Sequence, residues 1–288
     1  MRTINVCIPR GIKLLNCESF WEHGYYGQNI KVAVIDSGCD INHVCLSDRI
    51  IGCKNFTTEG GNNDVTDHYA HGTHITGIIG ANGCDGGIIG VAPKCELFIV
   101  KVLNKRGETG TSEFLNAINY AIALNVDIIN ISISGKYNSP ILHNTIMEAK
   151  DNNIMVVCAS GNNPKEDLKS ELYYPGAYKE CIDVGATNFE GRVLKFSNPS
   201  TSVDLVCYGA NITSTYPNNK YAKCSGTSQA SPFVSGALAL LKCYFLDVHK
   251  RPPTYQELYD LLISYTNEIE NTDKLLQGNG LLRLEWRG

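Results

Sequence analysis

The stretch KVAVIDSGCD, residues 31–40, joins an almost unbroken apolar run to an aspartate and a glycine-containing turn. An apolar run without polar alternation is typical of a strand that is covered on both faces, as in a parallel sheet. Together with residues 31–36, the later apolar runs predict the strands of one mostly parallel sheet. These later runs lie at 97–103, 126–132, 154–160, 181–187 and 203–209.

Segments with helical periodicity lie between the predicted strands. Apolar residues recur on one helical face of SEFLNAINYAIAL (112–124), and PILHNTIMEAKDNN (140–153) opens with a proline, which is favoured in a first turn. The segment that begins near Ser228 is apolar nearly all round, which predicts a central buried helix. This alternation predicts an α/β fold, a doubly wound, mostly parallel sheet with helices on both faces.

The chain of 288 residues can bury a sizeable core, since 43% of it is hydrophobic and 19% is charged. Without a dividing linker or repeat, we expect a single domain over residues 21–288 after a short N-terminal segment, residues 1–20. The net charge of −4 gives no basis for a nucleic-acid partner. The sequence shows neither the apolar core of a signal peptide nor the ~18 apolar residues of a membrane span. We therefore expect a cytoplasmic protein without a membrane partner.

The twelve cysteines contain no C-x-x-C pair and no spacing typical of zinc ligands. Several stand in apolar runs, such as Cys158 and Cys243, where a free thiol behaves as a small hydrophobic group. In a cytoplasmic protein we expect reduced thiols. We expect no metal ligands among them.

Reactive side chains in α/β sheets gather where the carboxyl ends of strands meet the beginnings of helices. Asp36 ends the first predicted strand, His71 begins the helical pattern of HGTHITGIIG, and Ser228 lies in the first turn of the buried helix. Each also has a structural interpretation, as a turn former, a core or metal-binding histidine, and a helix cap. A metal site with His68 and His74 would lack the glutamate of H-E-x-x-H. The chain order Asp, His, Ser matches one known arrangement of a catalytic triad, which favours a joint role.

VAVIDSGCD, HGTHITGIIG and SGTSQASP resemble the three catalytic blocks of the subtilisin family of serine proteases, peptidase S8. GVAPKCELFIVKVL, VDIINISISG and VVCASGNN resemble the family's intervening segments in the same order. The stretch GIKLLNCESFWEHGYYGQNIKVAVIDSGCD is most similar to the bacterial intracellular subtilisins. The resemblance implies a subtilisin-like fold and a serine endopeptidase that hydrolyses peptide bonds through an acyl-enzyme intermediate.

By this resemblance, His71 takes the proton of Ser228, and Asp36 orients the imidazole ring. The side-chain amide of Asn162 and the backbone N–H of Ser228 would bind the oxyanion. Pro232 has no N–H, so it would leave the carbonyl of Ser228 without its helical partner. A pseudoenzyme that only binds peptides is disfavoured because all these residues are present. A small-molecule-binding α/β protein is disfavoured because no G-x-G-x-x-G or P-loop follows a strand.

The family binds an extended peptide between two backbone segments, which here match RGETG (106–110) and SISG (132–135). The resemblance therefore implies polypeptide substrates. It also implies a homodimer, because the intracellular members are often dimeric. The implied substrate-binding residues are Gly107, Glu108, Thr109, Ser132, Ile133, Ser134, Gly135 and Gln229.

Many relatives bind calcium through an aspartate at the position that Cys45 occupies here. A thiol is a poor ligand for a hard cation that takes about six to eight oxygens. The partner loop NGCDGGIIG (82–90) keeps its glycines, and Asp85 could supply an oxygen ligand. We expect no required cofactor and, at most, a weak calcium site.

Overall fold

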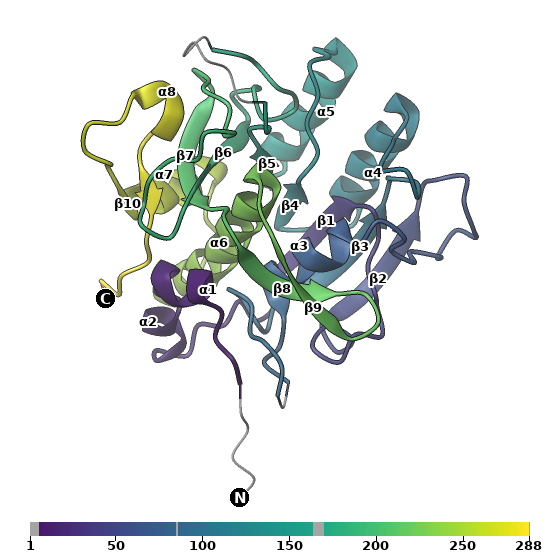
Figure 1. The fold of residues 1–288 in the computed structure, drawn as a ribbon, viewed down its shortest axis with the longest axis horizontal. Coiled ribbons are helices and arrows are strands. Elements are labelled where there is room, and N and C mark those ends of the chain that lie inside the picture. The colour runs from purple at the N-terminus through teal and green to yellow at the C-terminus, as the bar shows by residue number, and fades with distance from the viewer. Residues whose placement is uncertain (1–5, 85, 164–169, 288) are drawn as a thin grey trace, which may run out of the picture.

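The computed structural model describes residues 6–84, 86–163 and 170–287. The strands of its main sheet are β1 (Lys31–Asp36), β2 (Ile50–Asn55), β3 (Glu96–Lys101), β4 (Ile128–Ile131), β5 (Met155–Ala159), β6 (Cys181–Thr187), β7 (Val203–Tyr208), β10 (Thr266–Asn267) and β11 (Leu281–Leu282). This nine-stranded sheet has the order β10-β11-β7-β6-β5-β4-β1-β3-β2 (Figure 1). Neighbouring strands pair in parallel, except for the antiparallel pair β10–β11.

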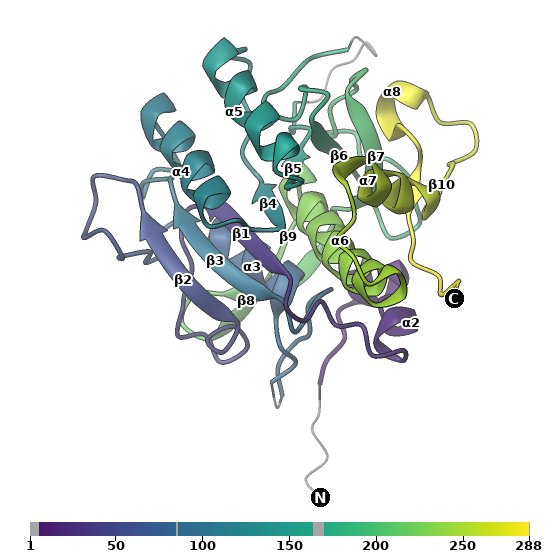
Figure 2. The ribbon, with the colours of Figure 1, turned by 180° about the vertical axis from the view of Figure 1, so that it is seen from behind.

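Helices cover both faces of the sheet. They are α1 (Arg10–Leu15), α2 (Glu18–Trp21), α3 (His71–Gly80), α4 (Thr111–Ala123), α5 (Pro140–Asp151), α6 (Thr227–His249), α7 (Tyr255–Ser264) and α8 (Lys274–Gln277). α4 and α5 lie side by side over one hydrophobic core (Figure 2), and α3, α6 and α7 pack in the core on the opposite face. A separate hairpin is formed by β8 (Ile212–Tyr216) and β9 (Lys220–Cys224). The predicted doubly wound, mostly parallel α/β fold is confirmed.

The strand β1 shows why its sequence has no polar alternation. Val32 and Val34 point into the core of α3 and α6, whereas Ala33 and Ile35 point into the core of α4 and α5. Successive side chains of a strand face opposite sides of the sheet, so both sets must be apolar when both sides are covered. This burial fixes β1 in the interior, with Asp36 at its carboxyl end.

All six predicted strands are present as neighbours in the sheet, namely β1, β3, β4, β5, β6 and β7. The sequence patterns did not predict β2, which lies at the edge of the sheet beside β3. Its residues Ile50 to Lys54 are only partly buried or exposed, so the strand carries no continuous apolar run. An edge strand needs less apolar surface, which explains why this signal was weak.

The long helix α6 runs through the centre of the protein and carries Ser228 in its first turn. By length and composition alone it is apolar enough to cross a membrane, but 78% of its most apolar window is buried inside the protein. It packs against α3, α7, β1 and the strands β4 to β7. The predicted central buried helix is therefore confirmed.

The N-terminal helices pack against the same core as α6. Ile12 and Leu15 of α1 and Phe20 of α2 are almost fully buried there. The backbone N–H of Leu284 donates a hydrogen bond to the carbonyl of Leu15. The boundary that we predicted between residues 20 and 21 thus falls inside α2, and residues 10–20 pack with the rest of the fold.

Two carboxyl groups, one buried and one half-buried, lie between β6, β7 and α7. Asp183 is 1% exposed, and its Oδ2 accepts a hydrogen bond from Ser202. Its Oδ1 has no hydrogen-bond partner within the described part of the chain. Asp204 accepts hydrogen bonds from the backbone N–H of Asp183 and from the hydroxyl of Tyr259. Burial raises the pKa of Asp183 from its ordinary 3.8 to about 7 and the pKa of Asp204 to about 6.

We expect Asp183→Asn to become increasingly stabilising as the pH rises. The folded protein holds the Asp183 proton more tightly than the unfolded chain does. The contribution of this group to stability is therefore complete below pH 3.8 and is lost as the pH rises through about 7. The asparagine variant should gain about 2–3 kcal/mol over the wild type between pH 5 and pH 8.

Urea unfolding at pH 5, 6, 7 and 8 measures this difference. The exposed Asp151→Asn on α5 is the matched control for replacing an aspartate at the surface. A constant difference between Asp183→Asn and the wild type at all four pH values would contradict the prediction.

Candidate active site

Asp36 and His71 form a hydrogen-bonded pair at the junction of β1 and α3. The Nδ1 atom of His71 lies 2.8 and 2.9 Å from the two carboxylate oxygens of Asp36. The close approach requires glycine after His71, because a Cβ atom on Gly72 would lie 2.1 Å from the carbonyl oxygen of Gly38. A carboxylate can only accept, so His71 carries its proton on Nδ1 and presents the lone pair of Nε2 outwards.

The surroundings of His71 favour its protonated form. Burial by itself lowers the pKa of the imidazole, but the carboxylates of Asp36 and then Asp67 outweigh this effect, so that the pKa of His71 is raised. A ring in this environment can take up a proton and hold it as an imidazolium. This property suits a general base.

Ser228 stands at the beginning of α6, beside the end of β4. Its hydroxyl donates a hydrogen bond of 3.0 Å to the carbonyl of Ser132. Its own carbonyl accepts a hydrogen bond from the hydroxyl of Ser132, because Pro232 has no N–H to donate. The predicted effect of Pro232 is therefore confirmed. No hydrogen bond in the described part of the chain joins the Ser228 hydroxyl to His71; a hydroxyl can rotate from one acceptor to another.

Asn162 lies in the loop after β5, and Thr227, the first residue of α6, fixes the orientation of its side chain. Its Oδ1 accepts hydrogen bonds from the N–H of Thr227 at 2.8 Å and from the hydroxyl of Thr227 at 3.1 Å. Because both donors hold the oxygen, the NH₂ group of Asn162 faces away from them. The side chain is exposed, so that its amide hydrogens are accessible to a ligand.

The structure therefore brings the predicted catalytic residues to one edge of the sheet. Asp36 follows β1, and Asn162 follows β5, and the strand β4 lies between them. His71 and Ser228 begin the two helices, α3 and α6, that pack against each other on this side. The carboxyl ends of parallel strands here meet helix N-termini, the usual place for a site in such a sheet.

Residues of both predicted peptide-binding segments line one cavity. A mostly apolar cavity of about 260 Å³ lies between Thr109 on one side and Ile133, Ser134 and Gly135 on the other. Its remaining lining residues are Gly110, Thr111, Phe114, Leu115, Tyr137, Ser139, Leu142 and Tyr174.

The other four predicted substrate-binding residues do not line this cavity. Ser132 is bonded to Ser228. A Cβ atom on Gly107 would touch the ring of Tyr69. Glu108 is exposed and accepts a hydrogen bond from Asn104. Gln229 is only 3% exposed and does not line the cavity.

Sequence reasoning did not single out Asp67, whose carboxylate accepts hydrogen bonds from the two turns that carry Asp36 and His71. The only signal was indirect. Ala70 precedes α3, and alanine has no side-chain oxygen with which to cap a helix. Another residue therefore had to supply the cap.

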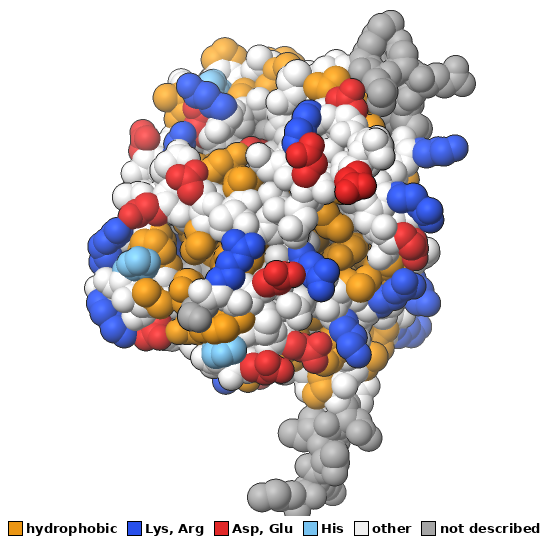
Figure 3. Space-filling view, turned by 90° about the vertical axis from the view of Figure 1, so that its left-hand side faces the viewer, with side chains coloured by type: hydrophobic (Ala, Val, Ile, Leu, Met, Phe, Trp, Pro, Cys, Tyr) orange, Lys and Arg blue, Asp and Glu red, His pale blue; other side chains and the backbone are white. Residues whose placement is uncertain are grey.

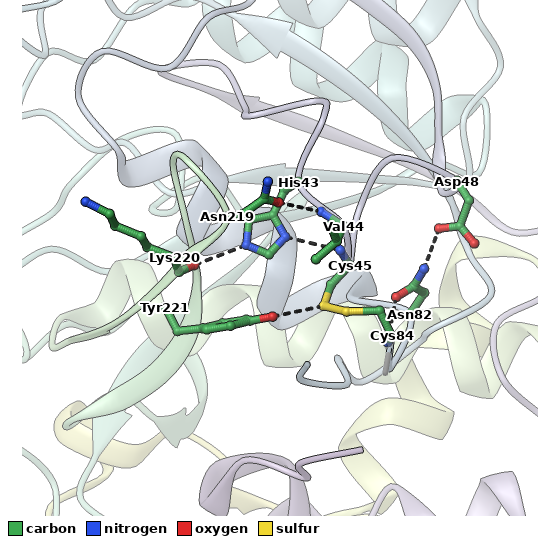
Figure 4. The surroundings of a disulfide bond; sticks show 9 residues. All are labelled: His43, Val44, Cys45, Asp48, Asn82, Cys84, Asn219, Lys220 and Tyr221. Carbon is green, nitrogen blue, oxygen red and sulfur yellow. Dashed lines mark hydrogen bonds between the residues drawn. A yellow bond between two sulfur atoms is a disulfide. The ribbon is translucent and has the colours of Figure 1, made fainter. Parts of the chain in front are cut away.

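A disulfide joins Cys45 to Cys84 in the loop that follows α3 (Figure 4). The expectation of reduced thiols is wrong for these two residues, because the fold brings them to a Cα–Cα distance of 5.2 Å, which a disulfide spans. The remaining cysteines are free. The hydroxyl of Tyr221 lies 3.3 Å from the sulfur of Cys45.

The described residues around this disulfide do not fit a calcium ion. A Cβ atom on Gly87 would lie 2.2 and 2.3 Å from the two sulfurs, so sulfur fills this space. The side-chain NH₂ of Asn82 donates a hydrogen bond to Asp48, and its Oδ1 accepts one from the backbone N–H of Cys84, so this oxygen already has a partner. Within the described residues, no group of His, Cys, Asp and Glu could hold a metal ion. Asp85, which could have supplied a ligand, lies outside the described residues.

Comparisons with known proteins identify the family of this chain and several of its relatives. A family model described as "Subtilase family" matches residues 27–280. The chain is 45% identical over 283 residues to the "Major intracellular serine protease" of Bacillus subtilis (strain 168), covering 96% of this chain and 88% of the relative. It is 44% identical to the "Intracellular serine protease" of Paenibacillus polymyxa, covering 96% and 85%. It is also 35% identical to "Subtilisin E" of Bacillus subtilis (strain 168), covering 96% and 70%.

Proposed function

Because the chain belongs to the subtilase family and is a serine endopeptidase, we propose that it cleaves polypeptides through a triad of Asp36, His71 and Ser228. The observation that carries the proposal is the pair of 2.8 and 2.9 Å contacts between Asp36 and His71, at the beginning of the helix α3 that packs against α6. Asp36 holds the proton on Nδ1, which leaves Nε2 of His71 to accept the hydroxyl proton of Ser228.

The proposed reaction has two steps. In the first, Oγ of Ser228 attacks the carbonyl carbon of the scissile bond while its proton passes to Nε2 of His71. The tetrahedral intermediate collapses to an acyl-enzyme as the C–N bond breaks, and the leaving amine takes the proton from His71. In the second step, a water gives a proton to Nε2 of His71 and its oxygen attacks the ester carbonyl. The second tetrahedral intermediate then collapses as the bond to Oγ of Ser228 breaks and His71 returns the proton to Oγ, which releases the new carboxylic acid and restores Ser228.

The developing negative charge needs donors that are already in place. The NH₂ group of Asn162 is supported in this role by the orientation that Thr227 imposes on its oxygen. The backbone N–H of Ser228 lies at the N-terminus of α6, where the helix dipole favours an anion.

Polypeptide substrates follow from the same proposal. An extended chain would lie between residues 106–110 and 132–135 and would place an apolar side chain in the 260 Å³ cavity between them. The large apolar residues Phe114, Leu142 and Tyr174 support this preference. On the face of the molecule shown in Figure 3, basic and acidic side chains are interspersed, and we propose no nucleic-acid or membrane partner. A homodimer remains an expectation from the resemblance.

A cytoplasmic location is the second part of the proposal. It is supported by two relatives that are named intracellular serine proteases. In a reducing cytoplasm the pair Cys45–Cys84 would meet thiol reductants, so the state of this pair in cells bears on the location.

A fluorophosphonate probe tests the triad. We expect it to modify one site, and peptide mapping should place the label on Ser228. Heat-denatured protein should stay unlabelled, because the reaction needs the assembled site. Labelling of another serine, or none in protein that cleaves peptides, would contradict the assignment. Label on Ser228 without any peptide cleavage would instead favour a peptide-binding pseudoenzyme.

We further propose that neither the stability nor the activity of the protein requires calcium. The sulfur of Cys45, at the position of the aspartate that binds calcium in many relatives, is bonded to Cys84 instead. Excess EDTA should leave the melting temperature and kcat of the oxidised protein unchanged. Dithiothreitol should lower the melting temperature by about 5–10 °C, since closing a loop across a sequence separation of 39 contributes about 4 kcal/mol. The double variant Cys45→Ser/Cys84→Ser is the control and should not respond to dithiothreitol. A lower melting temperature in EDTA alone would refute this part.

A further inference from the structure

The helix α3 begins at His71 without a cap of its own. The residue before it, Ala70, has no side-chain acceptor and a left-handed backbone with φ of +65°. The first N–H groups of a helix need acceptors, and alanine adopts positive φ only at a cost in free energy. Other residues must therefore satisfy these donors and hold this strained turn, or the imidazole of His71 would not be fixed.

Asp67 supplies both functions. Its Oδ2 accepts hydrogen bonds from the N–H of Thr73 at 2.8 Å and from the hydroxyl of Thr73 at 2.6 Å. Its Oδ1 accepts hydrogen bonds from the N–H of Ala70 at 2.7 Å and of Tyr69 at 3.2 Å. The first pair caps the helix, and the second pair holds the turn in its left-handed conformation.

The carboxylate of Asp67 is also linked to Asp36, through Ser37. Ser37 donates from its hydroxyl to Oδ1 of Asp67 at 2.8 Å and accepts from the N–H of Gly72 at 2.9 Å. Its backbone N–H donates to Oδ1 of Asp36 at 2.7 Å. Asp67 is thus linked to Asp36 through one residue and to His71 through another.

The environment of Asp67 fits a charged group with a fixed role. Asp67 is only 7% exposed. Both of its carboxylate oxygens accept hydrogen bonds from the donors named above. A buried carboxylate is tolerated where such donors compensate for the loss of water. A neutral residue would leave several of these donors without an acceptor.

We propose that Asp67 is a positioning residue that holds the Asp36–His71 pair in its reactive geometry. This inference rests on the proposed triad and extends it by a carboxylate that touches neither the substrate nor the reacting atoms. It acts by holding the two turns from which Asp36 and His71 project.

The charge of Asp67 gives a second effect that a purely structural residue would not have. Its carboxylate helps to raise the pKa of His71, after the larger contribution of Asp36 and against the effect of burial. The titratable groups around His71 are Asp36 of β1, Asp67 and Tyr69 of the turn before α3, and His74 of α3. The ammonium group of Lys101, on β3, donates a hydrogen bond to the carbonyl of Thr66, the residue before Asp67.

Asp67→Asn tests the proposal, because the amide keeps the shape but loses the charge and one acceptor. We expect kcat to fall about 10- to 100-fold with KM nearly unchanged, as for other residues that orient a reacting group. Because His71 must be neutral to act as base, a lower pKa should move the acidic limb of the kcat/KM profile to lower pH. Titration with the fluorophosphonate probe counts the folded sites, so that kcat refers to active protein only.

Two further variants keep the test sharp. The exposed Asp64→Asn, whose carboxylate accepts hydrogen bonds from Thr66 in its own turn, should behave as the wild type. Ser37→Ala removes the hydroxyl link but keeps the charge of Asp67, so kcat should fall severalfold while the acidic limb stays in place.

The proposal is overturned if Asp67→Asn, per titrated site, has the kcat and the pH profile of the wild type, even when its melting temperature is lower. Failure of the proposed triad would give a different result. The Ser228→Ala variant would then still cleave peptides, whatever the behaviour of Asp67→Asn.

Discussion

Replacing Ser228 by alanine is expected to lower kcat by about 10⁶-fold, the loss that subtilisin itself shows when its nucleophilic serine is removed. The variant keeps the cavity and the oxyanion donors but has no oxygen to form the acyl-enzyme. The nearest hydroxyls cannot replace it, because those of Ser132 and Ser231 are bonded to each other and to the carbonyl of Ser228. The measurement is kcat and KM on a peptide substrate, and KM should change little.

Ser231→Ala is the matched control for this variant, since it removes a hydroxyl one turn further along α6. It should keep most of the activity and the fluorophosphonate label. If Ser228→Ala kept more than about a thousandth of the wild-type kcat, Ser228 would not be the nucleophile.

Replacing Asp36 by asparagine should give the second largest effect, a loss of about 10⁴-fold in kcat that is known from serine proteases with this triad. Asp36 holds Nδ1 of His71 with both oxygens, at 2.8 and 2.9 Å. Asparagine can turn its NH₂ group toward Nδ1, which would place the proton on Nε2. In that tautomer His71 cannot accept the proton of Ser228.

The loss should appear in kcat, and in the rate of fluorophosphonate labelling, which reports the nucleophile before any peptide binds. Asp260→Asn, an exposed residue on α7, serves as the control for removal of a charge. An Asp36→Asn variant that is folded by circular dichroism and lies within tenfold of the wild-type kcat would rule out the proposed role.

The fold was predictable where burial is decided by the local sequence. The strands β1 and β5 are apolar on both faces, and α6 is apolar nearly all round, so each pattern has one interpretation. The edge strand β2 and the hairpin of β8 and β9 have mixed burial and weaker patterns. Their positions are set by pairing with distant segments, which periodicity does not reveal.

The same distinction applies to the site. Asp36 and His71 could be placed near each other because one ends a buried strand and the other begins a helix, and they are in contact. The cap provided by Asp67 and the bond between Cys45 and Cys84 depend on how the turns meet in space. The local sequence around Asp67, Cys45 and Cys84 does not specify these partners, and the alanine before α3 indicated only that some other residue must cap the helix.

The bond between Cys45 and Cys84 also closes the backbone into a covalent ring that contains His71 but neither Asp36 nor Ser228. Residues 60–64 form an exposed stretch on this ring, which an endopeptidase could cut in another copy of itself. One cut there opens the ring without releasing a fragment, because the two new ends stay tied through sulfur. The imidazole would remain attached to the rest of the molecule, so a nicked chain could go on working until its disulfide is reduced.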